Sequence, residues 1–238
     1  MPLKRPYRKK KKMYIKRTNR NRAFGRIPRS LKPKTYSFSR TFTHTVSLGN
    51  GSNSGWTELA SSADGPQAMV QQMEFSLADL DMSSDFKNLF SQYKLNAVSM
   101  KLYFANTNSN GTQNRQCICY IAPWRTGDTE TLTEKFFLNT QKHKTKLCQN
   151  TIGKPLSIYC PLKQLTRLYV SSETYTTSIT KPKYVSTAAP TVPHFGLNLR
   201  IQRVDGADFT SGTSSGSLNR WPAFKQETKL YFSCRQVE

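Results

Sequence analysis

The positive charge of this sequence is concentrated at one end. Residues 1–40 contain 16 of the 36 lysines and arginines, and no aspartate or glutamate precedes Glu58. The other 198 residues carry 20 basic and 14 acidic side chains. Like charges at such density repel one another, and residues 1–34 have almost no periodic apolar pattern to offset the cost of ordering them. The sequence therefore predicts an unfolded basic arm over 1–34 and one folded domain over 35–238.

The predicted arm is chemically suited to single-stranded nucleic acid. Arginine guanidinium groups fork onto phosphates and stack on bases, and the interleaved rings of Tyr7, Tyr14 and Phe24 add stacking surfaces. A solubilising tail is the alternative, but the absence of any compensating acid favours binding. The residues assigned to binding are Lys4, Arg5, Arg8, Lys9, Lys10, Lys11, Lys12, Lys16, Arg17, Arg20, Arg22, Arg26 and Arg29. The first seven of them also fit a nuclear localisation signal.

The composition of the whole chain argues against several classes of protein. A net charge of +22 and a pI near 10.0 favour a polyanionic partner over a small-molecule substrate. No run approaches the roughly 18 apolar residues of a membrane span, and the first residues lack the apolar core of a secretory signal. We therefore expect neither membrane insertion nor export. Five cysteines are then an odd number of buried thiols rather than a disulfide framework.

Most of the predicted domain alternates between apolar and polar residues with a period of two, which is typical of half-buried strands. The predicted strands are Tyr36–Leu48, Met69–Leu77, Val98–Phe104, Leu156–Cys160, Phe195–Ile201 and Leu230–Cys234. The stretch Cys117–Trp124 is apolar on both faces, which predicts a strand inside a sheet. Residues 171–193 and 205–224 are rich in small polar residues, Pro or Gly, which predicts long loops that contact partners.

One helix is predicted between these strands. Phe86, Leu89, Phe90 and Tyr93 recur at positions i, i+3, i+4 and i+7, with Ser83 or Ser84 as the N-cap. Seven or eight strands with a single short helix predict an all-β sandwich or barrel. Alternating βαβ units are absent from the pattern, which argues against a nucleotide-binding α/β fold.

The sequence offers little catalytic or metal-binding chemistry, so no enzyme, metal site or cofactor is predicted. His44, His143 and His194 lie far apart, and Cys117 and Cys119 have the spacing of core residues on one strand face. Residues 212–216 match the GxSxG hydrolase pattern around Ser214, but both flanks are typical of loops. The acidic residues Asp79, Asp81 and Asp85 are expected to border the helix N-terminus. The sequons at Asn50 and Asn110 are interpreted as turns.

The passage from the predicted helix into the next strand carries a specific resemblance. Phe90, Tyr93, Lys94, Leu95 and Val98 fill in order the pattern F-x-x-Y-(K/R)-(I/L)-x-x-V. This passage resembles that of capsid proteins from small circular single-stranded DNA viruses, the circovirus-like group. Similar passages occur in the coat proteins of satellite-type RNA plant viruses.

The resemblance implies a fold, an assembly and partners. It implies one eight-stranded antiparallel jelly roll of two four-stranded sheets, with long loops that contact neighbouring subunits. It further implies a homo-oligomeric T=1 icosahedral shell of about 60 copies, with the arms inside against single-stranded DNA. The virion and, during assembly, the host nucleus are the implied locations, with host import receptors and a cell-surface receptor as further partners. Some folded-domain cations, among Lys142, Lys144, Lys146, Arg200 and Arg203, are expected on the inner surface.

Three alternatives remain at the level of the sequence. The chain could be the coat protein of a satellite-type RNA virus. It could be a non-assembling basic β-domain that binds nucleic acid through exposed tyrosines, with Tyr103, Tyr120 and Tyr169 as candidates. It could be a hydrolase that uses Ser214, although no histidine or acid partner is identifiable.

Overall fold

The computed structural model describes residues 33–46, 55–104, 117–124, 127, 129–148, 154–169, 175–209 and 222–236. The strands are β1 (Thr35–Val46), β2 (Thr57–Leu59), β3 (Ala68–Phe75), β4 (Gln92–Phe104), β5 (Cys117–Pro123), β6 (Lys144–Cys148), β7 (Leu156–Pro161), β8 (Gln164–Tyr169), β9 (Tyr175–Thr180), β10 (Val185–Ser186), β11 (His194–Arg203) and β12 (Phe224–Arg235). The helical segments are the 3-10 turn η2 (Leu77–Asp79), α1 (Ser83–Leu89) and α2 (Glu134–Asn139). None of these helices is long and apolar enough to cross a membrane.

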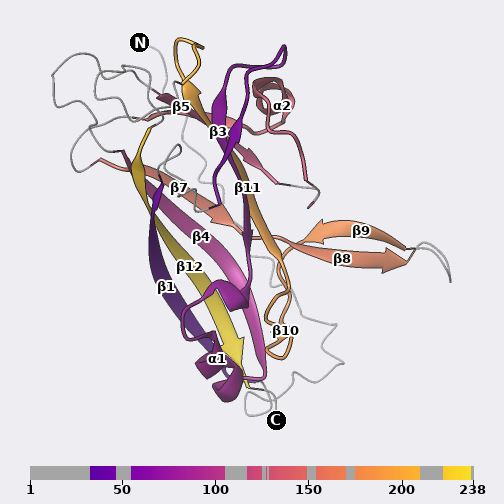
Figure 1. The fold of residues 1–238 in the computed structure, drawn as a ribbon. Helices are drawn as coiled ribbons and strands as arrows, with labels where there is room; N and C mark the ends of the chain where they lie inside the picture. Colours follow the sequence, from indigo (N-terminus) through magenta and orange to yellow (C-terminus); the bar gives the residue numbers. More distant parts are fainter. Residues whose placement is uncertain are drawn as a thin grey trace, which may run out of the picture. The chain divides into compact units, whose positions relative to one another are not determined.

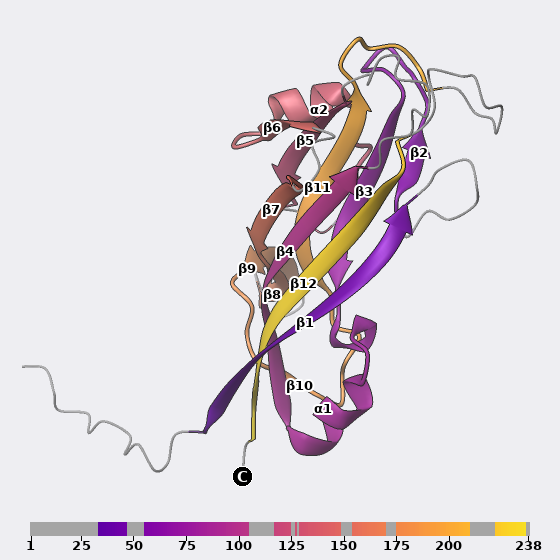
Figure 2. The ribbon, with the colours of Figure 1, turned by 90° about the vertical axis from the view of Figure 1, so that its left-hand side faces the viewer.

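The strands form two antiparallel five-stranded sheets that lie face to face (Figures 1 and 2). In the first sheet the order is β1, β12 and β4, and both β7 and β10 pair with the far edge of β4. In the second sheet the order is β2, β3, β11, β5 and β6. Apart from the consecutive pairs β2–β3 and β5–β6, neighbouring strands in both sheets are not consecutive along the chain, as in the double-sheet jelly roll. The eight strands predicted from the resemblance correspond to the longer members, and the two-residue β10 and three-residue β2 extend the sheets to five.

One long segment differs from the sequence prediction because its β-branched residues pair with a neighbouring strand. The predicted loop 171–193 contains β9 and β10, and β9 pairs with β8 along its full length, from Gln164 opposite Thr180 to Tyr169 opposite Tyr175. In Figure 1 this hairpin extends away from the two sheets. The second predicted loop, 205–224, lies largely outside the described residues.

The predicted helix is shorter than its apolar spacing suggested. α1 ends at Leu89, and Tyr93 belongs to β4 rather than to the helix. Its N-cap is Met82, in the left-handed region at φ 63°, and not Ser83 or Ser84. The matching spacing arose because Phe90 and Tyr93 face the core from extended backbone that follows the helix directly. Leu89, expected in the core, is instead 63% exposed.

The main core lies between the sheets. It is built from alternate residues of the long strands, among them Met100 of β4, Leu199 of β11 and Phe232 of β12, all fully buried. The rings of Phe38 and Phe86 pack beside Phe232, with centroids 5.6 and 5.0 Å from its own. Each fully buried aliphatic or aromatic side chain contributes roughly 1.5–3 kcal/mol. The alternating pattern thus identified the main core correctly.

A second, smaller core covers the other face of the second sheet. Helix α2, which the sequence analysis did not predict, packs Phe137 against Val70, Tyr120 and Ala122. Its N-cap is Thr133, whose side chain accepts a hydrogen bond from the Phe136 nitrogen at 3.2 Å. Six residues are too few to show a helical period. Because α2 and the adjoining loop cover this face, all ten residues of β11 are buried rather than every second one.

Candidate nucleic-acid interface

The thirteen predicted arm residues lie outside the described part of the chain. They are Lys4, Arg5, Arg8, Lys9, Lys10, Lys11, Lys12, Lys16, Arg17, Arg20, Arg22, Arg26 and Arg29. What the structure does describe is the point at which the chain enters the first sheet. Thr35, the first residue of β1, pairs with Arg235, the last residue of β12, and Arg235 pairs in turn with Gln92 of β4.

The first sheet turns one face to the core and the other away from it. On β12 the core row is Phe224 to Cys234 in steps of two, which leaves the odd-numbered residues on the other face. That second row is mainly cationic and aromatic. We call this surface the basic face and define it by Lys94, Tyr103 and Lys101 of β4, Tyr159 of β7, and Lys225, Glu227, Lys229, Tyr231 and Arg235 of β12. Figure 2 shows β7, β4, β12 and β1 side by side.

Two tyrosines and a lysine occupy the middle of the basic face. Tyr159 and Tyr231 lie on opposite sides of β4, with ring centroids 6.5 Å apart and planes at 62°. The Lys229 ammonium lies 5.3 Å from the Tyr231 centroid. The β4 residues between the two rings are small, Ala97 opposite Tyr231 and Ser99 opposite Tyr159. Because these neighbours are small, 67% of the Tyr159 surface is exposed.

Two cations gather on a third tyrosine where the arm joins the sheet. The Arg235 guanidinium lies 4.1 Å and the Lys94 ammonium 5.1 Å from the Tyr184 ring centroid. A β-bulge in β4 creates this proximity, because Asn96 is an extra residue and its side chain donates to the Ser233 hydroxyl at 2.7 Å. Within the described chain, neither Lys94 nor Arg235 pairs with a carboxylate.

The opposite end of the basic face carries its one acid. The Glu227 carboxylate lies 3.3 Å from the Lys101 ammonium and accepts a hydrogen bond from the Tyr103 hydroxyl at 3.4 Å. This contact raises the pKa of Lys101, so the lysine is charged at neutral pH. In total the basic face holds five cations and one carboxylate. Of the basic face, the sequence analysis named Tyr103 as a candidate binding tyrosine. The signal that would have indicated the other residues is the non-core rows of β4 and β12.

Of the five folded-domain cations of which some are expected on the inner surface, Arg200 and Arg203 are buried in the structure. The Arg200 guanidinium donates to the carbonyl oxygens of Leu132 and Pro66 and to the Gln202 side chain. Arg203 pairs with Asp205 and donates to the Asp208 carbonyl oxygen at 3.0 Å. These arginines hold loops against the second sheet and are structural.

Lys142, Lys144 and Lys146 do lie at the surface, as expected of some of these cations, with the last two on the edge strand β6. The Lys146 ammonium donates to the Ser157 carbonyl oxygen of β7 at 2.6 Å, which bridges the edges of the two sheets. Whether these lysines face the inside of an assembly stays a prediction.

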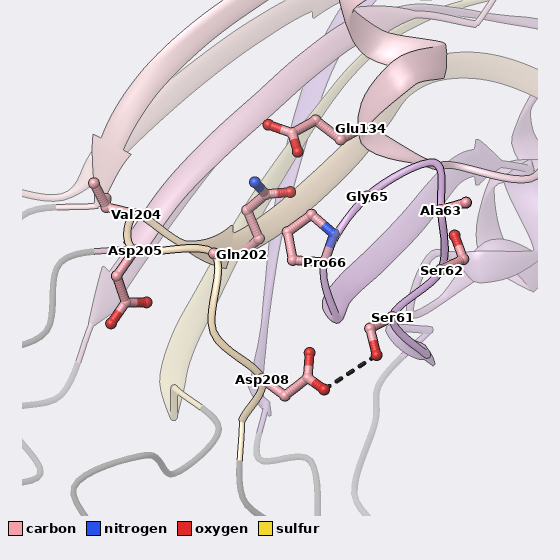
Figure 3. Close-up of a pocket in the computed structure, with 11 residues that line it drawn as sticks. Ser61, Ser62, Ala63, Gly65, Pro66, Glu134, Gln202, Val204, Asp205 and Asp208 are labelled. Carbon is pink, nitrogen blue, oxygen red and sulfur yellow. Dashed lines mark hydrogen bonds between the residues drawn. The ribbon is translucent and has the colours of Figure 1, made fainter.

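An open hollow beside α2 gathers three carboxylates without the geometry of a catalytic site (Figure 3). Glu134 accepts a hydrogen bond from Tyr120 at 2.7 Å, and burial together with this bond raises the pKa of Tyr120 to about 12. Arg203 lowers the pKa of Asp205. Asp208 accepts from the Ser61 hydroxyl at 3.1 Å. Each carboxylate thus has a structural partner, and no histidine, cysteine or lysine lines the hollow.

All five cysteines are free and buried, as the sequence predicted. Burial raises the pKa of Cys117 and Cys119 to about 12 and that of Cys160 and Cys234 to about 11. At neutral pH these buried thiols are therefore protonated, which is the less reactive form of cysteine. The described residues contain no group of three or more His, Cys, Asp or Glu side chains that could hold a metal ion. Ser214 and the sequons at Asn50 and Asn110 lie outside the described residues.

His194 is a buried titratable group at the start of β11. Its Nδ1 lies 3.0 Å from the Val192 carbonyl oxygen, its ring packs near Tyr93, and its Nε2 has no hydrogen-bond partner in the described structure. Burial lowers the pKa of His194 below its ordinary value of 6.5. The folded protein therefore holds this imidazole neutral.

We expect the domain to lose stability in mild acid because of this residue. The unfolded chain takes up a proton on His194 below about pH 6.5, whereas the folded chain does so only at lower pH, so the free energy of unfolding falls as pH falls through that window. Each unit by which folding lowers the pKa of His194 corresponds to about 1.4 kcal/mol in the free energy of unfolding. Urea unfolding at about pH 7.5 and 5 would measure this loss of stability. The variant His194→Gln should show a weaker dependence of stability on pH. An equally steep dependence in the variant would contradict this role.

Comparison with known proteins identifies the family. Residues 4–238 match the family described as circovirus capsid protein, which is nearly the whole chain. The chain belongs to that family. No individual curated protein matches it significantly in sequence. The prediction made from the Phe90–Val98 passage is therefore confirmed, and the chain is a viral capsid protein, a structural component of the virion.

The fold of this capsid protein is also that of solved relatives. The capsid protein of BFDV in its 60-mer crystal structure is similar with a TM-score of 0.53 at 11% identity, over 87% of this chain and 95% of that chain. The same protein in a decameric crystal structure has a TM-score of 0.49 at 13% identity, over 86% and 100%. At this identity the 60-mer match shows the jelly-roll fold alone.

Proposed function

We propose that this capsid protein assembles into a T=1 icosahedral shell of 60 copies and packages circular single-stranded DNA through its basic arm. Support for the assembly is the family membership together with the fold shared with the BFDV capsid protein, which is crystallised as a 60-mer. The observation that supports packaging is the arm itself, a basic segment without any acidic residue that precedes a jelly-roll domain. Sixty arms of residues 1–34, each with 15 lysines and arginines, would bring about 900 positive charges to the phosphates of one genome.

The arm would neutralise phosphates rather than read bases. Its cations are closely spaced and dominated at the start by lysines, which act as point charges and not as bidentate base readers. We therefore propose weak sequence preference and strong salt dependence. The cluster Lys4 to Lys12 would in addition serve as the signal that import receptors recognise, and assembly would then take place in the host nucleus.

Assembly is tested by electron microscopy and sedimentation of the full chain with and without circular single-stranded DNA. We expect uniform icosahedral particles that protect the nucleic acid. Extraction of nucleic acid that co-purifies from cells, followed by typing with DNA- and RNA-specific nucleases, identifies the genome type. Monomers under all ionic conditions would overturn the shell, and protected RNA alone would favour the satellite-type alternative.

Packaging by the arm is tested with a five-residue variant of the full chain in which Arg8 and Lys9–Lys12 are changed to glutamine. The slope of log K against log salt for a single strand is about −0.7 per phosphate contact, so the loss of five contacts should flatten it by about 3.5. Titration of a labelled oligothymidylate at several salt concentrations measures the slope. Circular dichroism should show an unchanged fold, and an unchanged slope would contradict binding by the arm.

A further inference from the structure

We propose that the basic face of the folded domain is a second binding surface for single-stranded nucleic acid, separate from the arm. In this proposal Lys94, Lys229 and Arg235 hold phosphates, and the exposed ring of Tyr159, which packs at 62° to that of Tyr231, is the platform on which a base stacks. The inference deepens the proposed function and rests on it for the class of ligand, but it uses different residues.

Most cations on the basic face lack the neighbouring acidic side chains that are usual on the surface of a soluble domain. Surfaces of soluble domains intersperse both signs, and cross-strand neighbours of opposite charge stabilise a sheet. Here Lys229 lies between the neutral Thr41 of β1 and Ser99 of β4, and Lys94 lies opposite Ser233. The one carboxylate, Glu227, is already bound by Lys101 and Tyr103. Lys94, Lys229 and Arg235 are therefore free to contact a polyanion.

The neutral surroundings of these cations also suit an anionic ligand. The Lys94 ammonium and the Arg235 guanidinium both contact the Tyr184 ring, and neither has a carboxylate partner among the described residues. A phosphate bound at this end of the basic face would offset the positive charge and accept charge-assisted hydrogen bonds from these side chains. Because Gln92 accepts from the Arg235 Nε at 2.6 Å, the rest of the guanidinium is held in place and can still donate.

The tyrosines indicate a single strand rather than a duplex. A base can stack on an aromatic side chain only when it is unstacked from its neighbours, which single strands allow. Tyr159 is 67% exposed in the middle of a strand and is flanked across the sheet by Ser99, so its ring is accessible. Lys229 beside Tyr231 places a cation within reach of the phosphate next to such a base.

The basic face is continuous with the point at which the arm joins the domain. Thr35, the first residue after the arm, pairs with Arg235, so the start of the domain and the contacts of Lys94 and Arg235 with Tyr184 lie at the same end of the sheet. From there β12 leads through Tyr231 and Lys229 to Lys225, ten residues or about 33 Å away. A strand held by the arm can thus continue along this path.

The phosphate contacts are tested in the full chain with the variant Lys94→Gln/Lys229→Gln/Arg235→Gln. Its control is Lys87→Gln/Lys154→Gln/Lys181→Gln, which removes the same charge from exposed positions outside the basic face. With a labelled oligothymidylate, we expect the salt slope to flatten by about 2 in the first variant, from three contacts at about 0.7 each, and to stay unchanged in the control. Equal changes in both variants, or none in either, would overturn the proposal.

The stacking contact is tested with Tyr159→Ser against two ligands, the oligothymidylate and an abasic strand of the same length. We expect about a tenfold weaker affinity for the first ligand only, since base–aromatic stacking contributes about 1–3 kcal/mol. Leu89→Ser, which removes an exposed apolar side chain from α1, should change neither affinity. Equal losses of affinity for both ligands would overturn the stacking role of Tyr159. A Tyr159→Ser variant that binds normally but no longer assembles in sedimentation would also overturn it, because the ring would then contact a second copy of the chain.

The same measurements distinguish this inference from the proposed function. If the arm variant flattens the salt slope and the variant of the basic face does not, packaging by the arm stands and the second surface is wrong. If the variant of the basic face flattens the slope and the arm variant does not, binding lies in the folded domain, and the proposed role of the arm is wrong.

Discussion

Leu199→Asp should abolish folding of this capsid protein. Leu199 is fully buried in the main core, on β11, with Gln71 of β3 and Ile121 of β5 as its neighbours across the sheet. The substitution removes the roughly 1.5–3 kcal/mol by which burial of the leucine side chain stabilises the fold. It also places a carboxylate in the core, where loss of its hydration costs several kcal/mol more. The sum is comparable with the whole free energy of unfolding of a domain, about 5–15 kcal/mol. Soluble yield and the thermal unfolding transition measure the effect.

A matched control separates burial from the change of residue type. Leu147→Asp makes the same exchange in another strand of the same sheet, the edge strand β6, where the side chain is 47% exposed. We expect that variant to unfold cooperatively within about 1 kcal/mol of the wild type. A folded Leu199→Asp protein with a normal transition would show that β11 does not form the centre of the core.

Arg200→Ala should cost about 3–5 kcal/mol of the free energy of unfolding. The guanidinium of Arg200 is fully buried and donates to the Leu132 carbonyl oxygen at 2.8 Å, to Pro66 and to Gln202. Truncation leaves these acceptors without partners and opens a cavity under α2. Urea unfolding at neutral pH measures the change.

Two further variants make the Arg200 prediction specific. Arg200→Lys should recover only part of the stability, because one ammonium cannot reproduce the fork that reaches three acceptors. Arg40→Ala removes an exposed arginine of β1 whose guanidinium lies 5.5 Å from the Phe86 ring, and should cost about 1 kcal/mol or less. A cost below 1 kcal/mol for Arg200→Ala would contradict its role in holding the loops.

Several elements of the fold were predictable from the sequence because their signal is local. The alternation in Phe195–Ile201 and Leu230–Cys234 reports which side chains share a face, and these rows do form the main core. The Phe90–Val98 passage identified the family, although the helical part of its spacing was wrong. Helix α2 was missed because six residues contain too little of a period to be recognised.

Only the arm, one of the two parts of the candidate interface, could be predicted from the sequence. Charge density marks the arm without any structure, and its thirteen residues stay a prediction. The basic face required the pairing of β7 with β4 and of β4 with β12, which brings Tyr159 and Tyr231 to 6.5 Å although they are distant in the chain. It also required the Asn96 bulge, which brings Lys94 and Arg235 to one ring.

By itself the sequence determined the segregation of charge, the all-β class and the viral capsid family, since composition, a period of two and a short motif are properties of neighbouring residues. Only the tertiary structure decided which strands pair, that β11 is buried on both faces, and that Arg200 and Arg203 lie inside while Lys229 and Arg235 lie outside. The physical reason is that strand pairing and burial depend on segments far apart in the chain. The same cationic side chain is buried or exposed according to what packs over its strand, and for Arg200 that covering is α2 and its loop.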